Sequence, residues 1–300
     1  MEAWVLISLA AAAAQTVRFM LQKHLRSVSL STAGSTFSRF IYSAPVIALI
    51  AVAYARTTGQ GAPVFGARFW AYAVMGGTAQ ILATMCVVAL FTQRNFAVGI
   101  TFKKTEVLLS ALVGLVLLGE WVSWLSLVAI LIGLAGVLLL SDNPGGSGQF
   151  WSRVVNRASA LGLASGLLFG ISAVSYRGAT LGLADGDTFY RAIVTLAFVT
   201  AFQTVALGLW LVARERGEIG RVLAAWRVAG FVGLTSMVGS VCWFVAFTLQ
   251  TAALVKAVGQ AEILLSLLAG WLVWGERISA REWQGLVLLA ASILMLVLVT

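Results

Sequence analysis

Long apolar runs, separated by short polar or charged gaps, follow one another along almost the whole chain. A helix that crosses a bilayer needs roughly 20 mostly apolar residues. Alternation of polar and apolar residues, which is typical of membrane β-barrel strands, is missing from the runs. The pattern therefore predicts an all-α integral membrane protein with ten transmembrane helices, near residues 3–22, 32–55, 67–92, 96–118, 121–141, 158–181, 187–213, 226–250, 252–274 and 280–299.

Composition excludes most other classes of protein. Apolar residues make up 60% of the 300 positions and charged residues only 10%, and the mean hydropathy is +0.97. Ordinary soluble domains are about 45–50% apolar and about 25% charged. A soluble enzyme, a secreted domain and a disordered chain are therefore excluded. The net charge of +9 sits in short gaps between apolar runs, which fits membrane topology and not a nucleic-acid surface.

The chain contains two related halves. Residues 106–123 and 262–279 are identical at nine of eighteen positions, at an offset of 156, and Cys86 and Cys242 share that offset. Such alignment of Glu, Ser and Gly positions indicates a tandem duplication. A Gly/Ser/Pro-rich stretch near the midpoint predicts a linker over 142–157, between a first five-helix repeat over 1–141 and a second over 158–300.

The number of spans in each half sets their relative orientation. Five is odd, so the second half must enter the membrane in the opposite direction, and inverted repeats around a central cavity are typical of secondary transporters. Basic residues set the absolute orientation. Gaps after odd-numbered spans hold eleven and the other side only four, which predicts both termini outside the cytoplasm. The eleven are Lys23, Arg26, Arg94, Arg153, Arg157, Arg214, Arg216, Arg221, Arg227, Arg277 and Arg281.

Several kinds of chemistry lack their components. One histidine, His24, and two cysteines inside apolar runs supply neither a catalytic triad nor a metal site. No Walker loop is present. We therefore expect no enzyme activity, no cofactor, no metal, no ATP and no nucleic acid. The expected partners are a small-molecule substrate and the lipid bilayer, with the chain as a monomer.

Two five-helix halves, each ending in a hairpin with Gly-Glu at its turn, resemble the drug/metabolite transporter superfamily, specifically its ten-helix EamA-type members. The residues that carry this resemblance are Gly119-Glu120 in the first half and the run from Gly275 to Ser279, followed by Trp283-Gln284-Gly285, in the second. The resemblance implies an exporter of amino acids or similar metabolites in the bacterial inner membrane. This chain has Glu106 and Glu262 where such families often carry a proline, and the charge count places its termini opposite to the usual description.

Charged residues inside spans are functional candidates, because they are costly in a membrane unless they are paired or face water. Glu106 and Glu262 each begin the pattern Glu-x3-Ser-x3-Gly, which places three residues on one helical face. This face is either a close helix contact or a cavity wall whose carboxylates titrate or gate. Arg18 is expected to snorkel to the interface. For Arg39 the sequence favours neither snorkelling nor pairing.

The two glutamates differ in their neighbours. Lys103 lies three residues before Glu106, whereas its counterpart in the second half is a glycine. A nearby cation favours an ionised carboxylate, so we expect Glu106 to be a charged partner of Lys103. If transport is coupled to protons, we expect Glu262 to be the proton carrier. Lys104 corresponds to Gln260, which suggests that one half presents a cation to the substrate and the other an amide. Snorkelling of these lysines is the alternative.

A cavity for a small zwitterion needs a few directed polar groups in apolar surroundings. The predicted substrate-binding set is Gln15, Thr78, Gln80, Lys104, Ser172, Tyr176, Ser236, Trp243 and Gln260, and the predicted coupling or gating set is Glu106, Glu262 and Lys103. The function expected is export of amino acids or related metabolites by alternating access. The alternatives are transport of phosphorylated or other anionic metabolites and, less favoured, multidrug export.

Overall fold

The structure of the protein, a computed structural model, describes residues 2–28, 30–90, 102–141, 157–265 and 280–299. Every regular element in these residues is a helix, which confirms the all-α class. The first half contains α1 (Ala3–Val28), α2 (Thr32–Ile41), α3 (Ser43–Thr58), α4 (Ala67–Leu90), α6 (Glu106–Leu118) and α7 (Trp124–Ser141). The second contains α9 (Arg157–Leu181), α10 (Thr188–Arg214), α11 (Glu218–Ala224), α12 (Trp226–Leu249), α13 (Ala252–Gly259) and α15 (Ala280–Val299).

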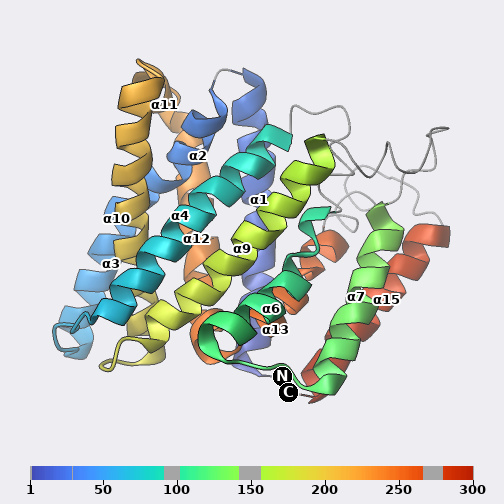
Figure 1. The fold of residues 1–300 in the computed structure, drawn as a ribbon. Helices are drawn as coiled ribbons and strands as arrows, with labels where there is room; N and C mark the ends of the chain where they lie inside the picture. The colour runs from blue at the N-terminus through green and yellow to red at the C-terminus, as the bar shows by residue number, and fades with distance from the viewer. Residues whose placement is uncertain (1, 29, 91–101, 142–156, 266–279, 300) are drawn as a thin grey trace.

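Helix length and composition fit a multi-pass membrane protein. Among the described residues, five helical segments are long and apolar enough to cross a bilayer: 32–58, 67–90, 157–181, 188–214 and 226–249. Shorter apolar helices cover 3–18, 106–118, 124–139 and 283–299. Each of the ten predicted spans therefore coincides with helix where the structure describes it. The end of the third span and the start of the fourth (91–101), most of the linker (142–156) and the far part of the ninth span (266–274) lie outside the described residues. The two termini lie on the same side of the molecule (Figure 1), as an even number of crossings requires.

Helix packing is reciprocal between the halves. The third span of the first half, α4, packs along α9, the first span of the second half. The equivalent helices with the halves exchanged, α12 and α1, pack in the same way, and the last spans, α7 and α15, pack on each other. The extensive contacts therefore run between the halves, and the interface between them is the core of the molecule.

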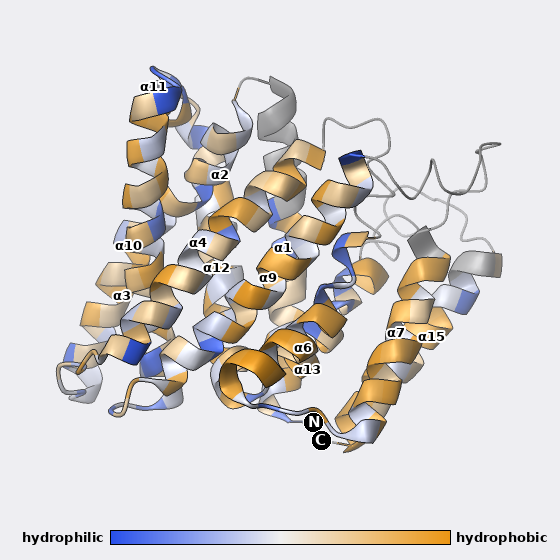
Figure 2. Cartoon of the chain, in the orientation of Figure 1, coloured by the Kyte–Doolittle hydropathy of each residue, from blue (hydrophilic) through white to orange (hydrophobic). Residues whose placement is uncertain are grey.

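Polar and apolar side chains are arranged as a bilayer requires. Many large apolar side chains are exposed on the outside of the helices, including Leu49, Val116, Val205 and Leu298. Serine, threonine, glutamine and several charged side chains are buried between the helices. Figure 2 shows hydrophobic positions along most of each helix, with hydrophilic positions mainly near the helix ends and at a few places along their length. Lipid contacts the first set, so the protein interior is where polar groups find partners.

Three of the predicted spans are broken helices. The second is interrupted at Tyr42, between α2 and α3. Pro45 lies in the first turn of α3 and has no N–H for the carbonyl of Ile41, which explains the break. The fourth is interrupted by a turn at Lys104 and Thr105, and the ninth by a turn at Gln260.

The short helix α11 is an element that the hydrophobic pattern does not predict. It lies between α10 and α12 and packs on α2. Its Glu218 is fully buried, and the carboxylate accepts a 2.6 Å hydrogen bond from the backbone N–H of Ser31, the N-cap of α2. A carboxylate at a helix N-terminus is favourable, so α11 holds the start of the helix that carries Arg39.

Candidate functional site

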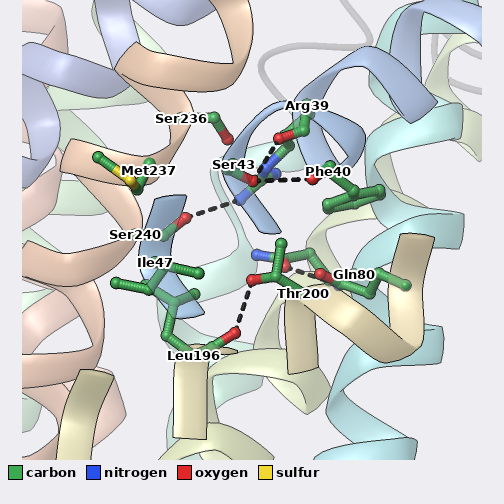
Figure 3. A pocket seen from close by; sticks show the side chains of 11 residues that line it. Arg39, Phe40, Ser43, Ile47, Gln80, Leu196, Thr200, Ser236, Met237 and Ser240 are labelled. Carbon is green, nitrogen blue, oxygen red and sulfur yellow. Dashed lines mark hydrogen bonds between the residues drawn. The ribbon is translucent and has the colours of Figure 1, made fainter. Parts of the chain in front are cut away.

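Arg39 lies in the last turn of α2, at the interface between the halves, with only 5% of its surface exposed. Its guanidinium donates to the hydroxyl of Thr84 on α4 at 3.3 Å and to that of Ser240 on α12 at 3.4 Å. The Ser43 hydroxyl donates to the backbone carbonyl of Arg39 at 2.7 Å, which closes the broken end of α2 (Figure 3). The break therefore fixes a cation deep in the molecule, where it does not snorkel.

Arg39 lines two neighbouring cavities. Both cavities also contact Gln80 of α4 and Ser240 of α12, so each is built from both halves. Their volumes are about 10 and about 20 Å³, which is room for roughly one water molecule each. In this conformation the interface is closed around a polar centre, and a metabolite enters only if helices move apart.

A three-residue polar network forms one wall of these cavities. Tyr176 donates to Gln80 Oε1 at 2.8 Å, and Gln203 Nε2 donates to the same oxygen at 2.9 Å. A Cβ on Gly76 would lie 2.8 Å from the Tyr176 ring, so the missing side chain allows α9 to approach α4 this closely. The two halves are thus joined by hydrogen bonds between side chains that sequence reasoning only partly identified, since Gln203 was not among its candidates.

Aromatic side chains and Lys256 also line the larger cavity. The Lys256 ammonium lies 4.7 Å from the Trp243 ring centroid and 5.5 Å from that of Phe169, both within cation–π range. Phe247 stacks on Trp243 with centroids 5.8 Å apart. A Cβ at Gly259 would overlap the indole, so this glycine allows α13 to pass beneath Trp243.

The Glu106 carboxylate forms long ion pairs with two lysines. Its Oε1 lies 3.8 Å from Lys103 and 3.9 Å from Lys256. The other carboxylate oxygen is buried and has no hydrogen-bond partner among the described residues. The expected pairing with Lys103 is present, and Lys256 joins it from the other half.

Glu262 is paired, contrary to the expectation that it lacks a cation. Lys104 donates to its Oε1 across the interface between the halves, and Gln15 donates to its Oε2 at 2.6 Å. The expectation was wrong because it counted only lysines within one turn of the same helix. Lys104 and Glu262 lie far apart in sequence, and α6 and α13 pack side by side, so the second-half carboxylate uses a first-half cation. The basis for assigning Glu262 as the proton carrier is thereby lost.

Arg18 is buried and does not snorkel. Only 2% of its surface is exposed, and it lies within electrostatic range of Arg39 and Glu262. The snorkelling expectation assumed that the first span ends near residue 22, whereas α1 continues to Val28. Arg39 and Glu262 come from other segments of the chain, so neighbouring helices enclose the Arg18 side chain and keep it from the interface.

Positive charge exceeds negative charge in this buried centre. Its cations are Arg18, Arg39, Lys103, Lys104 and Lys256, and its carboxylates, among the described residues, are Glu106 and Glu262. Neighbouring members interact electrostatically. Arg39 has no carboxylate in the ion pairs of the described residues, and a buried charge without an opposite charge is costly. The interface beside Arg39 therefore favours an anionic group.

The other predicted residues are placed as follows. Ser172 lines the larger cavity and Ser236 the smaller one. Lys104 and Gln260 line a third cavity, between α6, α7, α13 and α15, and so lie apart from the Arg39 cavities. Thr78 is exposed on the outer side of α4 and lines neither Arg39 cavity. Two residues from Gln80 along a helix is more than half a turn, so both cannot face the centre.

The Glu-x3-Ser-x3-Gly face of the first half packs against α9. Ser110 donates to the Glu106 carbonyl within the helix, and Gly170 of α9 comes so close that a Cβ there would lie 3.2 Å from the Ser110 nitrogen. Glu106, Ser110 and Gly114 are all buried. Ser110 and Gly114 therefore serve close helix contact, while Glu106 meets the lysines. Ser266 and Gly270, their second-half counterparts, lie outside the described residues.

Arg177 forms a clamp on the side of the termini, and sequence reasoning missed it. Its Nε donates to both oxygens of Glu120, in the α6–α7 turn, at 2.7 and 2.9 Å. Its Nη1 donates to the carbonyls of Phe247 and Gln250 at the end of α12. One guanidinium thus ties the Gly-Glu turn of the first half to two helices of the second. The available signal was the Gly-Glu pair that occurs in both repeats, as Gly119-Glu120 in the first, but the sequence did not indicate that Arg177 is the partner of Glu120.

Comparison with known proteins gives a family and a fold. Residues 156–298 match the model of the EamA-like transporter family. No curated protein gives a significant match. One crystal structure aligns over 99% of this chain and 96% of its own, with a TM-score of 0.72 and 15% sequence identity. At that identity the likeness concerns the fold alone.

Proposed function

Through residues 156–298 the chain belongs to the EamA-like transporter family, and we propose that it is a secondary transporter that exports amino acids or related small metabolites by alternating access. Membership makes it a multi-pass membrane transporter of small solutes and not an enzyme. The substrate, the direction and the mechanism are the proposal. So is the location in a bacterial inner membrane, with both termini outside the cytoplasm.

The observation that carries this proposal is the buried polar centre between the two halves. Arg39, Gln80 and Ser240 bring donors and acceptors from both halves to the same two cavities. Aromatic side chains supply the apolar remainder of the larger one. A few directed polar groups in apolar surroundings are what a site for a small metabolite needs.

Alternating access requires the halves to move against each other. The helix breaks at Lys104 and at Gln260 occur at equivalent positions of the two repeats, where broken helices of secondary transporters often bind their substrates. Arg177 and Glu120 close the interface on the side of the termini. We propose that this clamp opens when that side opens, while Glu106, Glu262 and Lys103 adjust their pairing. These coupling roles remain predictions.

Transport of phosphorylated or other anionic metabolites is the second candidate. The surplus of buried cations favours it, because an anion would balance charges that the described carboxylates do not. A cationic multidrug substrate would meet repulsion from the same centre.

Flux into proteoliposomes tests the proposal. The purified chain is reconstituted and offered a panel of amino acids, organic phosphates and cationic dyes, with empty liposomes as the control. We expect saturable flux of amino acids or related metabolites. Saturable flux of organic phosphates alone would support the second candidate, and no flux of any small solute would overturn both.

A further inference from the structure

The larger cavity combines two cations with an aromatic wall and no carboxylate among the residues that line it. Arg39 and Lys256 line it from opposite halves, with 5% and 7% of their surfaces exposed. Trp243, Phe244 and Phe247 of α12 and Phe169 and Tyr176 of α9 form the wall. The cavity therefore offers positive charge and apolar aromatic surface, and no negative charge from its lining residues.

Neither cation has a close carboxylate partner among the described residues, so a ligand can provide the anion. The ion pairs of the described residues give Arg39 no carboxylate, only the Thr84 and Ser240 hydroxyls at 3.3 and 3.4 Å. Lys256 shares one oxygen of Glu106 with Lys103, at 3.9 Å. These distances are longer than those of charge-assisted hydrogen bonds, about 2.7–2.9 Å. The Arg39 guanidinium and the Lys256 ammonium can therefore form short hydrogen bonds to a ligand, because the interactions that they would give up are long.

Trp243 supplies an independent indication of a ligand. Its indole N–H is buried and has no acceptor among the described residues, although the ring lines the cavity. A buried N–H without an acceptor costs about 1–3 kcal/mol. A ligand oxygen would satisfy it, and a cationic ligand would not.

The rings of this wall are already used by a cation of the protein. Lys256 lies over Trp243, Phe169 and Phe247. A cationic ligand would have to replace this ammonium and would still meet Arg39. An anionic group meets attraction from both.

Resting on the proposed transport function, we infer that this cavity recognises the carboxylate of the substrate, held between Arg39, Lys256 and the Trp243 N–H, with the apolar part of the substrate against the aromatic wall. The carboxylate is the recognised group, and an amino group is not required. The cavity holds roughly one water in the closed conformation, so the aromatic wall moves outward when the substrate binds.

Three probes with the same phenyl group and chain length separate the charges: 3-phenylpropionate, L-phenylalanine and 2-phenylethylamine. Binding to the purified full-length protein is measured by titration calorimetry, with inorganic phosphate as a fourth probe. We expect 3-phenylpropionate and L-phenylalanine to bind and the amine not to bind. Equal binding of the amine, stronger binding of phosphate than of either carboxylate, or no carboxylate binding at millimolar concentration would overturn the assignment.

Substitutions locate the binding. Arg39→Gln should weaken 3-phenylpropionate binding about 10- to 100-fold, the usual effect of losing a charged hydrogen bond. Trp243→Phe, which keeps an aromatic ring at this position and removes the N–H, should weaken it about 3- to 10-fold. Arg191→Gln is the matched control. Arg191 ends the run Thr-Phe-Tyr-Arg in the second half as Arg39 ends Thr-Phe-Ser-Arg in the first, at an offset of 152, and Arg191 lines neither Arg39 cavity. Unchanged affinity in both cavity variants would overturn the proposal.

These results separate the site from the transport function. If Arg39→Gln does not fold, the site is still tested by Trp243→Phe and by comparing the binding of 3-phenylpropionate with that of 2-phenylethylamine to the unaltered protein. Carboxylate binding without flux of any solute would overturn the transport function and retain the site. Flux of another class of solute, with no carboxylate binding, would retain transport and overturn the site.

Discussion

Replacing Glu262 with glutamine tests the ion pair that joins the two halves. The Lys104 and Glu262 side chains are 4% and 13% exposed, so neither charge is well solvated. Glu262→Gln leaves the Lys104 ammonium without its carboxylate. Removing one member of a buried pair costs about 3–5 kcal/mol. Gln15 retains an acceptor in the new amide, which recovers part of its hydrogen bond.

The double variant separates the pair from its surroundings. Lys104→Gln together with Glu262→Gln removes both charges, and replacing a complete buried pair is often nearly neutral. Each single substitution should therefore cost about 3 kcal/mol or more beyond the loss in the double variant, so the two single losses do not add. The free energy of unfolding is measured by denaturant titration of the purified full-length protein in mild detergent.

A second cycle provides the control. Arg177→Gln combined with Glu262→Gln should be additive within about 0.5 kcal/mol, because Arg177 pairs with Glu120. Additivity of the Lys104 and Glu262 substitutions would refute the reasoning. In that case the two side chains would not support each other across the interface.

Three further predictions concern orientation and packing. A C-terminal fluorescent protein that matures only in the cytoplasm should stay dark, and bright cells would contradict termini outside the cytoplasm. Glu120→Gln should raise hydrogen exchange in the α6–α7 turn, because Arg177 loses its ionic partner; unchanged exchange would show that the clamp does not hold the turn. Gly259→Ala should lower the free energy of unfolding by about 1–3 kcal/mol, because the new methyl overlaps Trp243. Gly230→Ala, whose Cβ meets no atom within 4 Å, should not, and equal effects would contradict the packing argument.

Hydrophobic patterning was sufficient for the class of fold. Where the structure describes them, the runs of about 20 apolar residues correspond to helix, because a bilayer leaves the backbone few other options. The helix breaks were harder to predict from the sequence. Pro45 marks one of them, but the turns at Lys104 and Gln260 contain no proline and depend on how α6 and α13 cross the centre. Short helices such as α11 carry too few residues for a periodic signal.

The sequence predicted which polar residues lie inside the spans, but it did not predict which of them contact one another. Gln80 and Tyr176 were identified as polar groups inside spans, and they meet across the halves at 2.8 Å. Arg18 and Glu262 were misjudged because their surroundings come from helices distant in sequence. Sequence reasoning measures neighbours along one helix, whereas burial and ion pairing depend on the helices opposite. The duplication predicted equivalent positions, but it could not reveal which member of one half meets which member of the other.

Accessibility of the centre from the two sides of the membrane tests the central claim most directly. Ser240, which lines both Arg39 cavities, is replaced by cysteine in a Cys86→Ser/Cys242→Ser background, and an impermeant thiol reagent is applied from either side of sealed vesicles. The account predicts labelling from both sides, slowed by a transported solute identified in the flux panel. Labelling from one side only, or labelling that no transported solute slows, would contradict a solute path through this cavity.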